Sequence, residues 1–355
     1  MTCHLQSLYS VVPACASDPA PSRAAPLPAW GLSGLVSRLR LGTVEGQKTA
    51  DRYAYLGPEG TFTEAALAAF DPAALAGALP CATIQATLDA VRGGEVGHAI
   101  VPIENSVEGA VNATLDELAT GPDIVICAEL LLPVTFALLA RPGTSTGDVK
   151  TVGGHPQAQP QCRHWLAQHL PDAEWRPTSS NAEAARRAAE GLIDAALAGA
   201  FAADRYGLAV LASEVSDVAD AVTRFVVVGR PGPMPAATGA DRTSLVAFLR
   251  EDHPGALMEL LTEFAVRGIN LTRIESRPTG DGLGKYCFSI DCEGHLDDAR
   301  VGEALMGLRR VCADVRFLGS YPRHDGAPAQ VRPGTSDTEF AQAAAWLGRL
   351  RYGRV

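Results

Sequence analysis

Several hydroxyl and amide side chains lie at the points where predicted strands end and predicted helices begin. The residues at these junctions are Thr61, Asn105, Ser106 and Gln161. In open α/β sheets, ligands bind beyond the carboxyl ends of the strands, and helix N-termini present unpaired N–H groups to anions. Hydroxyls and amides placed there can hold a small anion and give it a hydrogen bond or a proton. They are poorly suited to activating water.

A simpler structural explanation exists for each of these four residues. Thr61 and Glu64 have the spacing of a capping box before an alanine-rich helix. Asn105 and Ser106 could cap the next helix, an alternative that stands level with ligand binding. Gln161, one turn into its helix, could equally lie on the surface. The residues at these junctions are therefore candidates for a ligand-binding site, but their positions alone do not establish one.

A fifth candidate is Thr223, which lies within residues 222–228, an apolar run that only a threonine and an arginine interrupt. Side chains alternate along a strand, so Thr223 and Phe225 share one face and Arg224 points to the other. Threonine is common in strands because its branched side chain packs well on a pleated surface. Taken alone, Thr223 is more simply explained as a strand former than as a catalytic group.

Strand and helix patterns alternate through residues 51–230, which we expect to form one domain of two lobes. This alternation predicts parallel sheets, and two such groups predict two lobes with a cleft between them. Residues 124–140 predict two strands broken at Pro133, where the chain could cross between the lobes. Residues 1–50 lack a steady periodicity and are expected to be a disordered leader.

Composition changes after residue 230. Residues 231–241 are rich in proline and glycine and predict a linker. Residues 242–322 follow the order βαββαβ, which is typical of a ferredoxin-like domain. The remaining tail, 323–355, is expected to carry a short helix at 339–350.

The 355 residues carry a formal net charge of -10, and 47% are hydrophobic and 20% charged, which is typical of a globular protein of two or three domains. The sequence has no basic stripe outside 349–354, so nucleic acid is not an expected partner. It also has no apolar run long enough to cross a bilayer, and we expect no membrane partner and a cytoplasmic location. Eight scattered cysteines without a C-x-x-C pair favour reduced core residues over disulfides or zinc.

The sequence contains no P-loop, dinucleotide fingerprint, metal-ligand spacing or Ser-His-Asp order, so we expect no metal and no cofactor. Two classes of function stay open from the residues alone. One is a two-lobed ligand-binding regulatory protein with an effector domain. The other is an enzyme whose chemistry needs little beyond positioning and one weak acid.

Six short stretches occur in one order along the chain. They are Tyr-Leu-Gly-Pro-Glu-Gly-Thr-Phe-Thr at 55–63, Val-Pro-Ile-Glu-Asn-Ser-Val-Glu-Gly at 101–109, His-Pro-Gln at 155–157 with Gln161, Val-Thr-Arg-Phe at 222–225, Pro-Gly-Ala-Leu at 254–257 and Glu-Ser-Arg-Pro at 275–278. Together with the linker, this series resembles monofunctional prephenate dehydratase over about residues 52–322. The resemblance implies a two-lobed catalytic domain like a periplasmic binding protein, followed by an ACT domain that senses phenylalanine.

The resemblance also implies a lyase reaction of phenylalanine biosynthesis, in which prephenate loses carbon dioxide and water to give phenylpyruvate. Thr223 matches the family's essential threonine and would give a hydrogen bond or a proton to the leaving hydroxyl. The expected substrate-binding residues are Thr61, Asn105, Ser106, Gln161, Arg224 and Phe225. For Arg224, a substrate carboxylate and a structural ion pair both stay open, because alternation turns its side chain away from Thr223.

Matched residues in the ACT domain imply a site for L-phenylalanine as an allosteric effector. They are Gly255, Ala256, Leu257, Asn270, Leu271, Glu275, Ser276, Arg277 and Pro278. Glycine admits a close backbone approach, and the start of the following helix supplies N–H groups. We expect L-phenylalanine to inhibit, and we expect a homodimer or homotetramer formed through the edges of the ACT sheet.

The resemblance has one departure, because the family commonly has serine before His-Pro-Gln whereas this chain has Gly154. The hydrogen bond of that serine would be absent or supplied by water. Arogenate dehydratase, which carries out the same reaction on the amino-acid analogue, is the nearest alternative. A non-catalytic, two-lobed amino-acid-binding regulatory protein is the alternative from another class.

Overall fold

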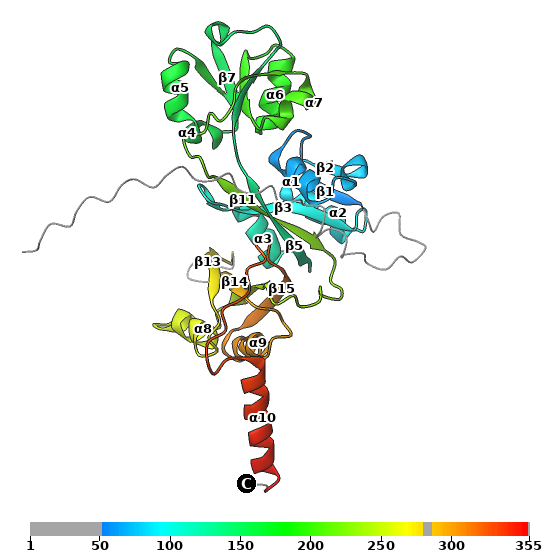
Figure 1. Cartoon of the computed structure of the whole chain (residues 1–355), viewed down its shortest axis with the longest axis vertical. Coiled ribbons are helices and arrows are strands. Elements are labelled where there is room, and N and C mark those ends of the chain that lie inside the picture. The colour runs from blue at the N-terminus through cyan, green and yellow to red at the C-terminus, as the bar shows by residue number, and fades with distance from the viewer. Residues whose placement is uncertain (1–51, 280–285, 354–355) are drawn as a thin grey trace, which may run out of the picture. The chain divides into compact units, whose positions relative to one another are not determined.

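The computed structural model describes residues 52–279 and 286–353, so the expected leader at 1–50 lies outside the described residues. The described chain forms three β-sheets with flanking helices (Figure 1). We call them the first-lobe sheet, the second-lobe sheet and the C-terminal sheet, in the order in which the chain enters them.

The first-lobe sheet contains the strand that carries Thr223. Its strands follow the order β2-β1-β3-β11-β5, with β4 paired to β3. The elements of this lobe are β1 (Tyr53–Leu56), α1 (Phe62–Phe70), η2 (Ala74–Gly77), β2 (Leu79–Cys81), α2 (Ile84–Arg92), β3 (His98–Asn105), β4 (Gly109–Ala110), α3 (Asn112–Thr120), β5 (Val125–Pro133) and β11 (Val222–Gly229). β11 lies between two neighbours, and its valine-rich sequence suits a strand that is buried on both faces.

The second-lobe sheet has the strand order β10-β6-β9-β7-β8. Its elements are β6 (Ala137–Ala140), η3 (Thr146–Asp148), β7 (Thr151–Gly154), α4 (Ala158–Gln161), α5 (Arg163–His169), β8 (Glu174–Pro177), α6 (Asn181–Ala189), β9 (Ala195–Ala198), α7 (Phe201–Tyr206) and β10 (Ala209–Ala212). The chain leaves the first lobe at the end of β5 and returns to it with β11. The crossing predicted at Pro133 is therefore confirmed.

The prediction of parallel sheets is only partly right. β1 runs parallel to β2 and β3, and β7 runs parallel to β8 and β9. β11 is antiparallel to both β3 and β5, while β6 is antiparallel to β9 and β10. These antiparallel strands border the crossings, where β5 leads to β6 and β10 leads to β11 without an intervening α-helix. A strand that leaves a lobe at the crossing and a strand that returns there run in opposite directions, so β5 and β11 are antiparallel, and so are β6 and β10.

The predicted helix that carries Gln161 is divided in two. Cys162 between α4 and α5 has a non-helical backbone, with φ −124° and ψ 14°. The carboxylate of Asp217 accepts hydrogen bonds from the backbone N–H groups of His164, at 2.8 Å, and Trp165, at 3.1 Å. Because these are orphan donors of a helix start, Asp217 begins α5 as a new helix.

The C-terminal sheet has the strand order β13-β14-β12-β15, and each neighbouring pair of strands is antiparallel. The elements follow as β12 (Asp241–Phe248), α8 (Ala256–Ala265), β13 (Leu271–Pro278), β14 (Tyr286–Glu293), α9 (Ala299–Val311) and β15 (Asp314–Pro322). The predicted βαββαβ order is confirmed. α8 starts at Ala256, because the preceding Gly255 adopts φ +98°, a left-handed conformation that glycine tolerates.

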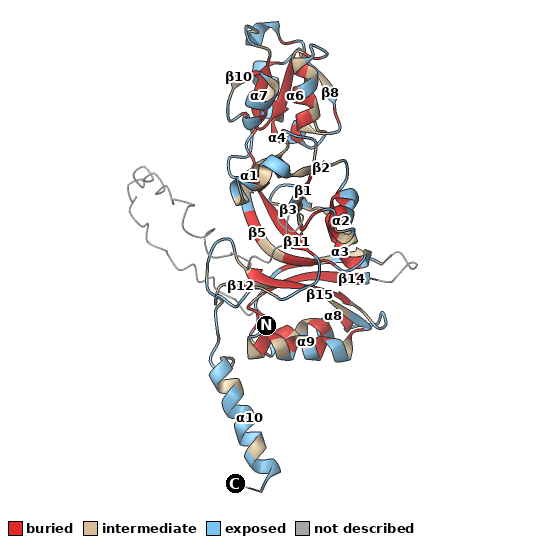
Figure 2. Cartoon of the chain, turned by 90° about the vertical axis from the view of Figure 1, so that its right-hand side faces the viewer, coloured by how far each residue is buried: buried red, intermediate tan, exposed pale blue. Residues whose placement is uncertain are grey.

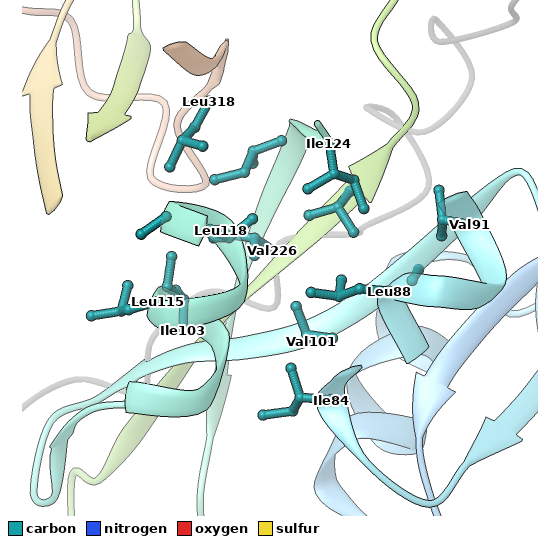
Figure 3. Packing of buried hydrophobic residues seen from close by; sticks show 14 of the residues in the cluster. Ile84, Leu88, Val91, Val101, Ile103, Leu115, Leu118, Ile124, Val226 and Leu318 are labelled. Carbon is teal, nitrogen blue, oxygen red and sulfur yellow. The ribbon is translucent and has the colours of Figure 1, made fainter. Parts of the chain in front are cut away.

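Both faces of the C-terminal sheet are covered. One face packs on α8 and α9, and Leu245, Ile290 and Leu308 share that core. The other face shares a hydrophobic core with the first-lobe sheet, in which Val226 of β11 and Leu318 of β15 belong to one cluster (Figure 3). The catalytic candidate strand and the C-terminal sheet are thus packed against each other.

Side chains alternate along β11 as predicted. Val226 and Val228 join the core shared with the C-terminal sheet, whereas Phe225 and Val227 join the core on the opposite face. Thr223 and Arg224 continue this alternation toward the start of the strand. The side chains of Thr223 and Arg224, which are neighbours in the chain, therefore lie on opposite faces of β11.

The predicted tail helix is present as α10 (Asp337–Arg351). None of its residues is buried, and its ribbon is almost wholly in the colours of exposed and intermediate residues (Figure 2). Among the described residues, no helix is long and apolar enough to cross a membrane.

Candidate active site

Thr223 and Asn105 are joined directly by a hydrogen bond. They are partners in the pairing of β11 with β3, and Nδ2 of Asn105 donates to Oγ1 of Thr223 at 2.8 Å. The side chain of Thr223 is nearly buried, with 7% exposure. The antiparallel pairing brings the start of β11 to the carboxyl end of β3, which is where the sequence placed a ligand site.

Two backbone contacts fix the orientation of the Asn105 amide. Its Oδ1 accepts from the N–H groups of Val107, at 2.8 Å, and Glu108, at 2.9 Å. Nδ2 is therefore the group that faces Thr223. Because Oγ1 of Thr223 accepts from Nδ2, the hydroxyl hydrogen of Thr223 can be donated elsewhere, and among the described residues no hydrogen bond gives it an acceptor.

Ser106 does not cap a helix. Its Oγ accepts from the N–H of Val222 at 2.9 Å, and its own N–H donates to the carbonyl of Val222 at 2.9 Å. α3 begins after Val111, which provides no side-chain cap. Ser106 therefore extends the β3–β11 pairing and holds the backbone beside Thr223.

Gln161 is buried and faces the first lobe, so the surface position considered for it is excluded. Its Nε2 donates to Oε1 of Glu108 at 3.2 Å, and Nε2 of Gln157 reaches Oε2 of Glu108 at 3.4 Å. Glu108 follows β3, whereas both glutamines belong to the α4 region. Sequence reasoning did not select Glu108, although it stands three residues after Asn105 in the stretch 101–109.

Thr61 caps α1, as the capping alternative predicted. Its Oγ1 accepts from the N–H of Glu64 at 3.4 Å and donates to the carbonyl of Leu56 at 3.1 Å. Glu64 in turn accepts from the N–H of Gly60 at 2.5 Å, one residue before the reciprocal contact of a capping box. The hydroxyl of Thr61 is thus engaged within the protein.

Phe225 lies in the core. Its side chain is 2% exposed and belongs to a cluster with Tyr55 and Leu67. In this structure the ring supports β11 and α1 from inside and does not border Thr223 as an exposed surface.

Gly154 stands against Trp175. A β-carbon at position 154 would lie 2.6 Å from Cη2 of Trp175, closer than real contacts come. The indole therefore fills the space into which a serine at 154 would extend. The neighbouring His155 donates its backbone N–H to Oδ1 of Asn181 at 2.8 Å, and burial lowers the pKa of its imidazole while Glu108 opposes that shift. His155 is consequently neutral at pH 7.

Arg224 contacts three carboxylates on the face of β11 opposite Thr223. Its Nη2 lies 2.5 Å from Oδ2 of Asp291, its Nη1 lies 3.2 Å from Oε2 of Glu129, and its Nε lies 3.2 Å from Oε2 of Glu104. The side chain is 5% exposed. This geometry favours the structural ion pair over the substrate contact, the two roles that the sequence left open.

Asp291 is the most deeply buried member of this charge cluster. It lies on β14, and Oδ2 accepts from Arg224 and also from Nε of Arg273 at 2.8 Å. Burial alone would raise the pKa of Asp291, but Arg273 and Arg224 outweigh burial and hold that pKa well below its usual range. The carboxylate is therefore ionised at neutral pH.

The expected effector residues lie on three neighbouring pieces of the C-terminal domain. Gly255, Ala256 and Leu257 form the start of α8, Asn270 precedes β13, and the remaining residues, Leu271, Glu275, Ser276, Arg277 and Pro278, belong to β13. Within the described strands, β13 pairs only with β14 and is an edge of its sheet. Arg277 forms a two-pronged ion pair with Asp116 of α3, at 2.8 and 2.9 Å, so it also contacts the first lobe.

The described cysteines fit a reduced core. All six of them are free, and burial raises the pKa of Cys162 and Cys292 to about 12. Their thiols are therefore protonated and unreactive at neutral pH. Over 52–279 and 286–353, no group of three or more His, Cys, Asp or Glu side chains is arranged to hold a metal ion.

Comparisons with known proteins agree with this architecture. A family model for prephenate dehydratase matches residues 53–233, and a model for the ACT domain matches residues 243–310. A prephenate dehydratase of Mycobacterium bovis is 52% identical over 311 residues, covering 85% of this chain and 95% of the relative. The solved prephenate dehydratase of Arthrobacter aurescens, in complex with L-Phe, is 51% identical with a TM-score of 0.81, covering 85% of this chain and 99% of that one. The prephenate dehydratase of Staphylococcus aureus superposes with a TM-score of 0.65 at 27% identity, covering 76% and 99%.

The fold and the site define a two-lobed α/β enzyme of the periplasmic-binding-protein type with a ferredoxin-like C-terminal domain. The chain belongs to the prephenate dehydratase family and carries a C-terminal ACT domain. The fold class and the enzyme class expected from the sequence are confirmed.

Proposed function

We propose that this protein converts prephenate into phenylpyruvate, carbon dioxide and water, and that Thr223 is its catalytic residue. In this reaction the bond from the ring to the carboxylate breaks, and its electron pair enters the ring. The carbon–oxygen bond at the opposite ring position then releases the hydroxyl, which takes up a proton and leaves as water. Formation of the aromatic ring supplies most of the driving force, so the protein has to orient the dianion and assist the leaving group.

The hydrogen bond from Asn105 to Thr223 carries this proposal. An oxygen that already accepts a hydrogen bond is a better donor of its own hydrogen, because the two bonds polarise each other. Thr223 is thereby prepared to donate to the leaving hydroxyl rather than to accept from it. A threonine alcohol is a weak acid, so a strong hydrogen bond that stabilises the departing oxygen is the main contribution we assign to it.

Other site residues have supporting roles in the proposal. Asn105 orients Thr223, Ser106 holds the adjoining backbone, and Gln161 with Glu108 links the lobes over the site. Thr61 contributes through the N-terminus of α1, whose free N–H groups and dipole favour a carboxylate. We propose no substrate contact for Arg224 or Phe225, because the first is held by three carboxylates and the second is in the core.

The test is to supply wild type and Thr223→Ala with prephenate and, separately, with arogenate, and to measure product formation. Wild type is expected to form phenylpyruvate from prephenate, and Thr223→Ala is expected to be nearly inactive. Equal rates for the two proteins would reject the role of Thr223. Turnover of arogenate in preference to prephenate would instead support the amino-acid analogue as substrate, and no turnover of either would support a binding protein.

We also propose that L-phenylalanine inhibits by binding at the ACT domain, near the start of α8 and β13. The relative from Arthrobacter aurescens was solved with L-Phe, and in this chain α8 is preceded by Gly255, which has φ +98°. Calorimetric titration of wild type and Gly255→Ala with L-phenylalanine checks this assignment. We expect wild type to bind and the variant to lose affinity, because alanine is strained at that φ.

Assembly, location and domain limits complete the proposal. We propose a homodimer or homotetramer joined through the exposed edges of the ACT sheet, because edge strands carry unpaired backbone groups. Sedimentation of a monomer, with and without L-phenylalanine, would contradict it.

We also propose a cytoplasmic location, which the free cysteines support. The proposed limits are 51–230 for the catalytic domain, 231–241 for the linker, 242–322 for the ACT domain and 323–355 for the tail.

A further inference from the structure

Asp291 connects the ACT sheet to the residue next to Thr223. Its Oδ2 contacts Nη2 of Arg224, and Arg224 follows Thr223 directly in β11. The side chain of Asp291 is fully buried, and its ion pair with Arg224 crosses from β14 to β11. Any displacement of this carboxylate therefore acts on the strand that carries the catalytic hydroxyl.

Arg273 holds the same carboxylate from the other side. Its Nε donates to Oδ2 of Asp291 at 2.8 Å and its Nη2 donates to Oδ1 at 3.0 Å, a two-pronged pair. Oδ2 is thus shared between Arg273 of β13 and Arg224 of β11. A shift of Arg273 changes how strongly this oxygen holds Arg224.

The position of Arg273 places it between the two parts of the expected effector site on β13. Asn270 and Leu271 precede it, and Glu275 follows it by two residues. The pairing of β13 with β14 shifts register between Leu271 and Arg273, as a β-bulge does. Bulges redirect side chains and bend edge strands, so a ligand that reshapes β13 moves Arg273.

The catalytic strand has a matching irregularity. The pairing of β11 with β3 shifts register between Arg224 and Phe225, one residue beyond Thr223. Asn105, the hydrogen-bond donor to Thr223, lies on β3 across this shift. The first three residues of β11 can therefore adjust against β3 without disturbing the regular valine run that follows.

We infer that Asp291 is a positioning residue that transmits the state of the effector strand β13 to Thr223, through its shared contacts with Arg273 and Arg224. This inference rests on the proposed function and adds the route by which the effector acts. An effector changes catalysis only to the extent that it favours one of two arrangements. Here the two arrangements differ in how closely the Asp291 carboxylate contacts Arg273 on one side and Arg224 on the other.

The test uses the full-length enzyme and two variants with matched controls. Asp291→Asn removes the charge of the shared carboxylate, and Arg273→Lys keeps the charge but removes the two-pronged geometry. The controls are Glu293→Gln and Arg323→Lys, which alter an ion pair at the end of β14 that joins Oε1 of Glu293 to Nη1 of Arg323 at 3.0 Å and does not contact β11. For each protein, kcat and KM for prephenate are measured with and without saturating L-phenylalanine, and L-phenylalanine affinity is measured by calorimetry.

We expect wild type and both controls to show an effector-dependent change in kcat/KM of about 5-fold to 150-fold, the usual range for coupled sites. Arg273→Lys is expected to remain active and to bind L-phenylalanine, while the effector-dependent change falls below about twofold. Asp291→Asn is expected to lower kcat more than it alters KM and to lose the response in the same way.

An unchanged response in Arg273→Lys overturns the inference, and so does loss of L-phenylalanine binding by that variant, because Arg273 would then belong to the effector site itself. Arg273→Lys decides the question if Asp291→Asn does not fold. A wild type that forms no phenylpyruvate contradicts the proposed function. A wild type that is active and ignores L-phenylalanine leaves the catalytic proposal standing and overturns this one.

Discussion

Two adjacent residues of β11 have opposite surroundings. The hydroxyl of Thr223 receives one hydrogen bond, from Asn105, and keeps a hydrogen to give. The guanidinium of Arg224, on the other face, is held by Asp291, Glu129 and Glu104. A polar group with spare hydrogen-bonding capacity can act on a ligand, whereas a buried guanidinium whose three nitrogens all contact carboxylates holds structure. We therefore expect one face of the strand to serve catalysis, while the other face contacts the C-terminal domain through Asp291.

The largest effect on stability is expected from the Arg224 face. Arg224→Met should lower the free energy of unfolding by about 3 kcal/mol or more, because removing one partner of a buried ion pair leaves charge uncompensated. Urea denaturation measures this change. Arg186→Met is the matched control, since Arg186 also contacts two carboxylates but is 47% exposed, and it should change stability little. Equal losses in the two variants would mean that Arg224 is no more structural than a surface arginine.

The Asn105 contact should affect rate and leave stability largely intact. Asn105→Asp keeps an oxygen for the N–H groups of Val107 and Glu108 but replaces the donor that faces Thr223. We expect kcat to fall about 10-fold to 100-fold, within the range for a misaligned acid catalyst. Steady-state kinetics with prephenate gives the number. A variant with unchanged kcat would show that the orientation of Thr223 does not depend on Asn105.

The smallest effect is expected in the pH dependence of the stability that Asp291 contributes through its ion pairs with Arg273 and Arg224. Arg273 and Arg224 hold the pKa of Asp291 below its ordinary value despite burial, so the unfolded chain takes up the proton first as pH falls. The stability that Asp291 contributes is therefore present above about pH 4, the ordinary value for aspartate, and is lost as pH falls below it. Urea midpoints measured from pH 6 to pH 3 should decline more steeply in wild type than in Asp291→Asn. Parallel declines would contradict the lowered pKa.

The sequence predicted the order of elements better than their pairing. Alternating patterns identified β11, the crossing at Pro133 and the βαββαβ domain, because these depend on local periodicity. The antiparallel course of β11 could not be predicted, since it depends on the direct passage between lobes. The break at Cys162 was missed because the group that starts α5, Asp217, lies 53 residues away from His164.

The site was predictable as a set of residue types and less so as a set of contacts. Thr223 and Asn105 were both selected, yet the sequence could not show that their side chains meet, because they lie 118 residues apart. Glu108 was missed because a glutamate after a turn has no distinctive spacing. The contact of Arg224 with Asp291 could not be predicted either. Asp291 belongs to another domain, and the sequence predicted only the strand on which it lies.

The most direct test of the proposal that the Thr223 hydroxyl is catalytic compares kcat with the thermal unfolding midpoint. Both are measured for Thr223→Val and Thr223→Ser. Valine has the shape of threonine without the hydroxyl, and serine keeps the hydroxyl. We predict that Thr223→Val loses kcat by about 100-fold to 10,000-fold, the range for an acid catalyst, while its unfolding midpoint stays close to that of wild type and Thr223→Ser retains most of its activity. A Thr223→Val variant as active as wild type, or one whose lost activity is matched by loss of the fold, would contradict the catalytic role of the hydroxyl.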